Sequence, residues 1–313
     1  MNPHPGVTRT AGPGHPGGVT EPRCAAISAD LEEPQAGTAA TAAAWICLEQ
    51  PGPWGRDALT QSRLDPALGA ELARRAAETG VRVLLIRRPG RHADTHHDAP
   101  RRVYLAATAP GRARLEQADV ADPAVLLDLD FAALAAGHPT GLGTPVAGPL
   151  LLVCANSRRD VCCALRGRPL AEALAAARPD AVWECTHTGG HRFAPTGVLL
   201  PTGYTYGRLD TDFAARLLDD AALGNVVTDR CRGRSTHAPR GQVAELAVRD
   251  LTGEHRDVLT VHGDTVHHAD GSAWHVTVAE RDLPAARPAS CGAPPTAATG
   301  LVATAVRRLV PVG

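Results

Sequence analysis

Two histidines and two glycines give the stretch CTHTGGHRFAPTG (residues 185–197) its chemical character. His187 and His191 lie four positions apart, with Gly189 and Gly190 between them. A helix would place both imidazoles on one face, but each glycine disfavours a helix by roughly 1 kcal/mol relative to alanine. We therefore expect a tight loop that directs both rings toward one point.

Two cysteines upstream complete a possible metal site. Cys154 ends the apolar run PLLLVC, and Cys163 follows in CANSRRDVCC, with Cys162 directly before it. In a strand–helix–strand crossover, the ends of both strands can lie at the same edge of a sheet. We therefore expect Cys154 and Cys163 to meet the two histidines in a Cys2His2 set, with the glycines allowing the backbone to approach closely.

Two metal groups suit such ligands. Zinc accepts two thiolates and two imidazoles in a tetrahedron. A [2Fe-2S] cluster can be held by two cysteines on one iron and two histidines on the other. The spacing matches neither the C-x2-C of a zinc finger nor the C-x-H pairs of a Rieske centre. From the residues alone zinc is favoured because it is commoner, and both alternatives stay open.

The elements that must position these residues form an α/β unit. Apolar runs predict strands at 149–154, 181–187 and 196–203, and helical periodicity predicts helices at 167–180 and 209–223. Cys163 is then expected in the loop before the first helix. This order predicts a thioredoxin-like domain with a partly antiparallel sheet.

The region before residue 149 shows a similar order. Strands are expected at 42–50, 81–89, 101–108 and 124–130, with a helix at 65–80 that Asp65 caps and Gly80 ends. The predicted fold is α/β with tandem thioredoxin-like domains and a small appendage. Its parts are a disordered tail (1–22), a degenerate first domain (23–148), a second thioredoxin-like domain with the metal site (149–225) and a small α+β C-terminal region (226–313).

Composition excludes several classes of function. The 313-residue chain has a formal net charge of -1, which gives no electrostatic reason to expect nucleic acid or a membrane surface as partner. It has no lysine, which excludes Schiff-base lysines and the P-loop lysine. No signal peptide or apolar span is evident, so we expect a soluble cytoplasmic protein. In that reducing compartment the eight cysteines favour metal or redox chemistry over disulfides.

Several separated motifs resemble the sucrase/ferredoxin-like family. They are CANSRRDVCC, HTGGHRFAPTGVLLPTGYTYGRL and the upstream QAGTAATAAAWICLEQPGPWG. The family pattern has a cysteine, eight residues, a second cysteine, an H-x3-H pair and a downstream Y-G-R, which matches Tyr206, Gly207 and Arg208. An Arg-Asp pair before the second cysteine corresponds to Arg159 and Asp160. The resemblance covers residues 24 to about 225.

The resemblance implies a thioredoxin-like ferredoxin that carries a [2Fe-2S] cluster and transfers single electrons. Its ligands would be Cys154, Cys163, His187 and His191. An exposed ligand histidine could lose a proton on oxidation, which would couple electron transfer to pH. An unidentified redox partner, either a protein or a small molecule, is implied. The residues expected to tune or support the cluster are Arg159, Asp160, Cys162, Gly189, Gly190 and Arg192, although the two arginines suit a solvated loop equally well.

Other interpretations remain open or are disfavoured. A glycosidase needs two carboxylates that face each other across the sugar, and no such pair stands out in the sequence. We therefore expect no catalytic residue, and we favour an electron carrier over a hydrolase. A non-redox binding module with a structural Cys2His2 zinc is the main alternative. Adjacent Cys162 and Cys163 make a poor redox dithiol compared with C-x-x-C. Cys185, two residues before His187, is expected to be a core cysteine close to the cluster rather than a fifth ligand. The remaining cysteines are expected to be dispersed and structural or incidental (Cys24, Cys47, Cys231, Cys291), and HADTHHD (92–98) to be a solvated loop.

Overall fold

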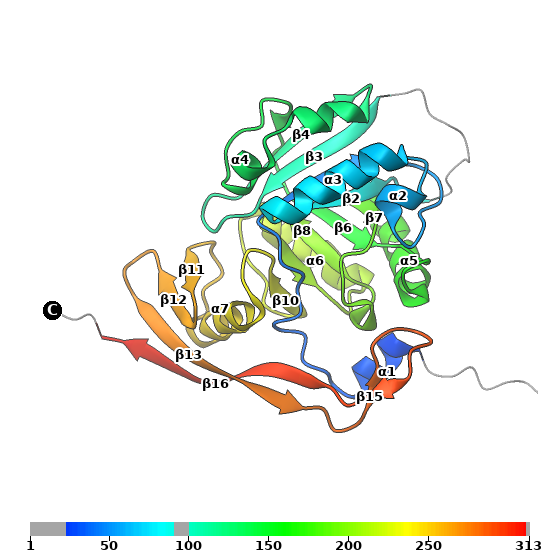
Figure 1. The fold of residues 1–313 in the computed structure, drawn as a ribbon. Helices are drawn as coiled ribbons and strands as arrows, with labels where there is room; N and C mark the ends of the chain where they lie inside the picture. Colours follow the sequence, from blue (N-terminus) through cyan, green and yellow to red (C-terminus); the bar gives the residue numbers. More distant parts are fainter. Residues whose placement is uncertain (1–22, 91–99, 311–313) are drawn as a thin grey trace, which may run out of the picture.

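A ten-stranded mixed sheet forms the centre of the computed structural model, which describes residues 23–90 and 100–310 (Figure 1). The strand order is β10-β9-β8-β6-β7-β2-β1-β3-β4-β5. The predicted disordered tail (1–22) and the HADTHHD segment (92–98) lie outside the described residues. Apolar clusters line both faces of the sheet, because the central strands are buried on both sides.

The first half of the sheet contains the strands expected at 42–50, 81–89 and 101–108 and the helix expected at 65–80, and it adds a strand at 114–120 that the sequence did not predict. β1 (Ala44–Glu49) pairs in parallel with β2 (Val81–Arg87), and α3 (Pro66–Thr79) connects them. β3 (Arg101–Ala107) and β4 (Arg114–Val120) continue the sheet in antiparallel fashion. The carboxylate of Asp65 caps α3 and Gly80 ends it with φ +71°, as predicted.

The second half contains the predicted strands and helices that carry the Cys and His motifs. β6 (Leu150–Cys154) and β7 (Val182–Cys185) are parallel and joined by α5 (Val161–Ala177). β8 (Gly197–Leu200) and β9 (Tyr204–Tyr206) follow in antiparallel fashion, and α6 (Thr211–Ala222) packs beneath them.

The two halves repeat one strand order and share one sheet. Each half runs β-α-β-β-β, with its parallel pair in the middle of the molecule. β2 of the first half pairs with β7 of the second, and the buried ion pair between Arg87 and Glu184 joins them at 2.7 Å. The chain is therefore a mixed α/β protein, while the assignment of each half to the thioredoxin-like class stays a prediction.

The C-terminal region adds one more strand to the large sheet and forms a second sheet. β10 (Cys231–Arg234) pairs with β9, and α7 (Pro239–Thr252) packs behind it. The second sheet has the order β11-β12-β13-β16, formed by Leu259–His262, Thr265–His268, Ala273–Asp282 and Thr299–Leu309. Its long strands run past the large sheet toward α1 (Cys24–Asp30) (Figure 1).

Short elements complete the described fold. The bounds are α2 Ala58–Gln61, η1 Pro123–Asp128, α4 Phe131–Ala135, β5 Thr144–Pro145, η2 His191–Phe193, β14 Arg287–Pro288 and β15 Pro295–Thr296. β14 and β15 form a two-stranded hairpin that packs near α1.

One predicted strand is wrong, and one predicted helix has different bounds. Residues 124–130 do not form a strand, because Pro123 begins the 3-10 helix η1 and Asp122 caps it by accepting the N–H of Ala124. The helix predicted at 167–180 begins earlier, at Val161, because the Asp160 carboxylate accepts the N–H of Cys162. Cys163 therefore lies inside the first turn of α5 rather than in a loop before it.

Candidate metal centre

Three of the four predicted ligands lie together in the structure. The ligand atoms of Cys154, Cys163 and His187 are all within 4.8 Å of one another. Cys154 ends β6, Cys163 lies in the first turn of α5, and His187 follows β7. The crossover explains this arrangement, because β6 and β7 are parallel and Cys154 aligns with Cys185 at the same sheet edge.

A glycine allows α5 to approach β6 closely enough for the two thiols to meet. Gly167 lies one helical turn after Cys163 and thus on the same face of α5. A Cβ atom at Gly167 would lie 2.2 Å from the carbonyl oxygen of Cys154, a distance that no side chain permits. Absence of a side chain at Gly167 therefore lets the helix bring Cys163 against the end of β6.

The electrostatic environment of Cys154 favours its thiolate form. Hydrogen bonding with the Cys163 thiol holds the pKa of Cys154 well below its usual range, against the opposing effect of burial, and His187 adds to the lowering. The same interaction raises the pKa of Cys163, and burial raises it further. Cys154 is thus prepared to bind a metal as a thiolate.

The histidine loop adopts the tight conformation that its glycines predict. Gly189 has φ +87° and Gly190 has φ +69°, both in the region that glycine adopts most readily. A Cβ atom at Gly190 would lie 2.3 Å from the Arg232 guanidinium. Arg232 is buried beneath the loop and donates to the carbonyl oxygen of Gly189 at 2.9 Å.

His191 lies beside His187, with 5.5 Å between the ring centroids. It is not among the three residues whose ligand atoms lie within 4.8 Å of one another. Its Nε2 lies 2.9 Å from the carbonyl oxygen of Ala289. Because a carbonyl can only accept, Nε2 carries the proton, and in the neutral ring the lone pair is on Nδ1. Burial lowers the pKa of His191, which favours the neutral imidazole that a metal requires.

Two buried nitrogen atoms in this site have no hydrogen-bond partner among the described residues. They are Nδ1 of His187 and Nδ1 of His191. Buried polar atoms are rarely left unpaired, so each such atom calls for an explanation. Two thiols and two unpaired imidazole nitrogens form the donor set of a Cys2His2 metal site, and the residues present therefore fit such a group.

Two arginines, the half-buried Arg82 and the buried Arg232, lie beside the site. Arg82 donates to the carbonyl oxygen of His187 at 3.2 Å. Arg232 is fully buried, and burial lowers its pKa to about 9. Both guanidinium groups lie near enough to Cys154 for attraction to its thiolate to oppose that lowering. The site therefore favours bound groups of negative charge.

The supporting residues predicted beside the ligands have different environments. Arg159 is exposed. Arg192 is not a free loop cation, because its Nε donates to the buried Glu33 at 2.7 Å. Cys185 is fully buried in the sheet core beside Cys154 and is not one of the three clustered residues.

The Y-G-R motif packs against the histidine loop. A Cβ atom at Gly207 would lie 2.8 Å from the Cβ of Phe193, so only glycine fits there. The Arg208 N–H donates to the carbonyl oxygen of Phe193, and its guanidinium donates to carbonyl oxygens of Ser28 and Glu33. The motif thus fixes the loop that carries His191 and attaches the N-terminal segment to it.

Sequence reasoning missed a second group of cysteines. Cys24 and Cys291, expected to be dispersed, instead lie beside Cys162 and Asp160, and their ligand atoms are within 4.8 Å of one another. A hydrogen bond from Cys24 lowers the pKa of Cys162 to about 6, against the effect of burial. No spacing signal could have revealed this group, because Cys24 and Cys291 are separated by most of the chain.

Among the residues that the structure describes, no helix combines the length and apolar character that crossing a membrane requires.

No curated protein and no solved structure matches the chain. The sucrase/ferredoxin-like family model matches residues 35–233, which is more than half of the chain and includes Cys154, Cys163, His187 and His191. The chain therefore belongs to the sucrase/ferredoxin-like family.

Proposed function

We propose that this protein is an electron-transfer protein that carries a [2Fe-2S] cluster bound by Cys154, Cys163, His187 and His191. The cluster accepts and releases one electron at a time when it is bound. The proposal includes thioredoxin-like folds for the two halves of the large sheet. It also places the protein in the cytoplasm, where a reducing environment preserves free thiols such as the eight in this chain.

One observation carries the proposal. The two imidazole Nδ1 atoms are buried without a hydrogen-bond partner among the described residues, beside the thiols of Cys154 and Cys163, whose sulfur atoms lie within 4.8 Å of each other. Membership of the sucrase/ferredoxin-like family then favours an iron–sulfur cluster over zinc for these four donors. The same donor set also suits a structural zinc, which makes zinc the alternative outcome of the experiment.

The protein's own residues would set the reduction potential. Two neutral imidazoles in place of two thiolates favour the reduced state, and such ligation is associated with potentials of roughly -150 to +300 mV, against about -400 mV for plant-type clusters. The half-buried Arg82 and the buried Arg232 favour additional negative charge by Coulomb attraction, so they would raise the potential further. The carbonyl oxygen of Ala289 holds the Nε2 proton of His191, and loss of that proton on oxidation would couple electron transfer to pH.

The redox partner is proposed to be a protein or a small-molecule donor or acceptor, and neither nucleic acid nor a membrane is proposed. The His191 side chain is 18% exposed, whereas Cys154 and Cys163 are fully buried. Electrons would therefore enter and leave on the histidine side, where the bound group comes nearest to solvent.

The test is the ultraviolet–visible spectrum of the anaerobically purified, full-length protein, with iron, sulfide and zinc measured on the same sample. Visible absorption that bleaches on reduction, with two irons and two sulfides per chain, is expected. Cys154→Ala should abolish the visible absorption and the bound iron and sulfide. The neighbouring Cys185→Ala, which removes a buried thiol from the same sheet edge, should retain them. A colourless protein with zinc at these four residues, after iron-replete expression, would contradict the proposal.

A further inference from the structure

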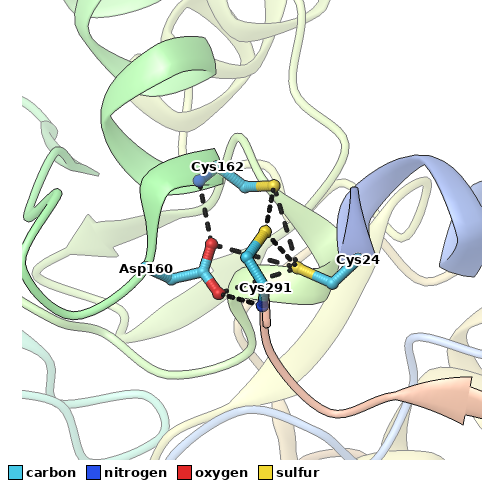
Figure 2. Close-up of side chains that lie close together, drawn as sticks. All are labelled: Cys24, Asp160, Cys162 and Cys291. Atoms are coloured by element: carbon cyan, nitrogen blue, oxygen red, sulfur yellow. Dashed lines mark hydrogen bonds between the residues drawn. The ribbon is translucent and has the colours of Figure 1, made fainter. Parts of the chain in front are cut away.

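A second group of metal-binding side chains lies outside the proposed cluster site. The Sγ atoms of Cys24, Cys162 and Cys291 are separated by 3.7 Å (Cys24–Cys162), 3.2 Å (Cys162–Cys291) and 3.4 Å (Cys24–Cys291) (Figure 2). A tetrahedral zinc with Zn–S bonds of about 2.3 Å places its sulfur atoms about 3.8 Å apart. The three thiols are therefore close to that spacing and need to separate by only tenths of an ångström.

Asp160 fixes the backbone of two of these cysteines. One of its carboxylate oxygens accepts the N–H of Cys162 at 2.8 Å, and the other accepts the N–H of Cys291 at 2.9 Å (Figure 2). Asp160 is only 4% exposed, and its Oδ2 lies 3.7 Å from the Cys24 sulfur. Each carboxylate oxygen can accept a second interaction, so Asp160 can also bind a metal.

The group lies at the edge of the molecule and is open to a metal ion from solvent. A surface groove of about 700 Å³ borders it and is lined by Arg23, Cys24, Ile27, Val161, Pro288 and Cys291, among others. Cys291 is itself partly exposed, while Cys24 and Cys162 are buried. A hydrated cation can therefore reach the thiols without unfolding of the core.

We infer that Cys24, Cys162 and Cys291 bind one zinc ion as thiolates, with the Asp160 carboxylate as the fourth ligand. Binding displaces to solvent the protons that remain on the three thiols, and no electron is transferred. Sulfur-rich tetrahedral sites without an open position are typical of structural zinc. This ion would not react with a substrate but would hold separate parts of the chain together.

The segments joined by this ion explain what it would do. Cys24 lies in α1, Cys162 in α5 and Cys291 in the loop between β14 and β15. The same loop provides the Ala289 carbonyl that accepts the Nε2 proton of His191. Zinc at the second group would therefore hold this loop over His191 and limit the exposure of the proposed cluster. Cys24 and Cys291 lie outside the segment that matches the family, residues 35–233.

The decisive measurement is zinc, iron and sulfide content of the full-length protein and its variants, purified anaerobically with reductant and supplied with zinc. The wild type should hold one zinc per chain, and Cys24→Ala and Cys291→Ala should hold none while retaining iron. Cys231→Ala, which removes a buried thiol from β10, should retain the zinc and serves as the matched control. Zinc retained in both ligand variants, or a wild type that binds none, would overturn the inference.

A second readout needs no substitution and detects the competing disulfide. Cobalt added to the zinc-free protein should give the thiolate-to-cobalt absorption and intense visible bands of a tetrahedral sulfur site. If Cys162 and Cys291 instead formed a disulfide under the same reducing conditions, peptide mapping would show a Cys162–Cys291 cross-link and no cobalt spectrum. That result would refute the zinc site.

Failure of this inference is distinguishable from failure of the proposed function. Cys154→Ala should lose iron and keep the zinc at the second group, whereas Cys291→Ala should lose zinc and keep iron. If the Cys2His2 residues bind zinc instead of a cluster, the wild type would hold two zinc ions, and Cys291→Ala would hold one. The second site would then stand although the electron-transfer proposal would not.

Discussion

Cys162 and Cys163 are consecutive in the first turn of α5, yet their thiols belong to different groups. Cys163 faces Cys154 and His187, whereas Cys162 faces Cys24 and Cys291. Neighbouring helical side chains point about 100° apart, so one turn can supply a ligand to each of two sites. Asp160, which caps this turn, therefore positions both groups at once.

The identity of His187 as a ligand predicts the effect of exchanging its imidazole for a thiolate. His187→Cys should retain a cluster but lower its reduction potential, because an additional negative ligand disfavours the reduced state. Redox titration followed by visible absorption measures this change. His275→Cys, at an exposed position on β13, is the control and should leave the potential unchanged. An unchanged potential in His187→Cys would exclude His187 as a ligand.

The close contact between Gly190 and Arg232 predicts that the loop tolerates no side chain. Gly190→Ala should displace the Arg232 guanidinium, reduce iron incorporation and destabilise the protein. Gly253→Ala is a matched control, because Gly253 has φ +68° and no atom lies within 4 Å of the place that an added Cβ would take. Gly253→Ala should lower the free energy of unfolding by only about 1 kcal/mol, because alanine is disfavoured in the left-handed backbone conformation of this position. Chemical denaturation and iron content measure both effects, and equal losses in the two variants would argue against the contact.

The buried carboxylate of Glu33 is expected to make the folded protein less stable in acid. Burial alone would raise its pKa, but Arg192 and Arg287 more than reverse this effect and hold the pKa below its usual range. A carboxyl group with a depressed folded-state pKa stabilises the fold above its unfolded value of about 4.3. That stabilisation is lost as the pH falls through the lower folded-state pKa.

Glu33→Gln should therefore be less stable than the wild type at neutral pH, with the difference shrinking as the pH falls below about 4. Urea denaturation between neutral and acidic pH measures the difference. Glu71→Gln, whose partners Arg74 and Arg75 lie on the surface of α3, should have a much smaller effect at neutral pH. A difference for Glu33→Gln that is independent of pH would show that its charge is not responsible.

Removal of the buried Arg249 side chain is expected to destabilise the protein strongly. Its guanidinium is fully buried, lies 2.9 Å from Glu245 and donates to the Tyr204 hydroxyl. Arg249→Ala would leave the Glu245 carboxylate buried without its cation and should cost about 3–5 kcal/mol. Arg240→Ala, on the exposed side of the same helix, should cost below about 1 kcal/mol. Similar decreases in the free energy of unfolding of the two variants, measured by chemical denaturation, would contradict this distinction.

Local sequence signals determined much of the fold. Asp65, Pro66 and Gly80 mark both ends of α3, and the apolar run before Cys154 predicts β6, because caps and burial patterns depend on nearby residues alone. The glycines between His187 and His191 likewise predicted the tight loop. Local signals are insufficient where one residue has two roles: the motif pattern marks Asp160, but it does not show that Asp160 caps α5 and extends this helix to Val161.

Tertiary structure alone decided which distant residues meet. The pairing of β2 with β7 joins both halves in one sheet, and the approach of the β14–β15 loop to α1 brings Cys291 beside Cys24. Neither the hydrophobic periodicity nor the spacing of motifs predicts such contacts, because they depend on how separately formed elements pack. The sequence by itself therefore determined the Cys and His motif and the glycine loop, whereas packing determined the thiol group of Cys24, Cys162 and Cys291.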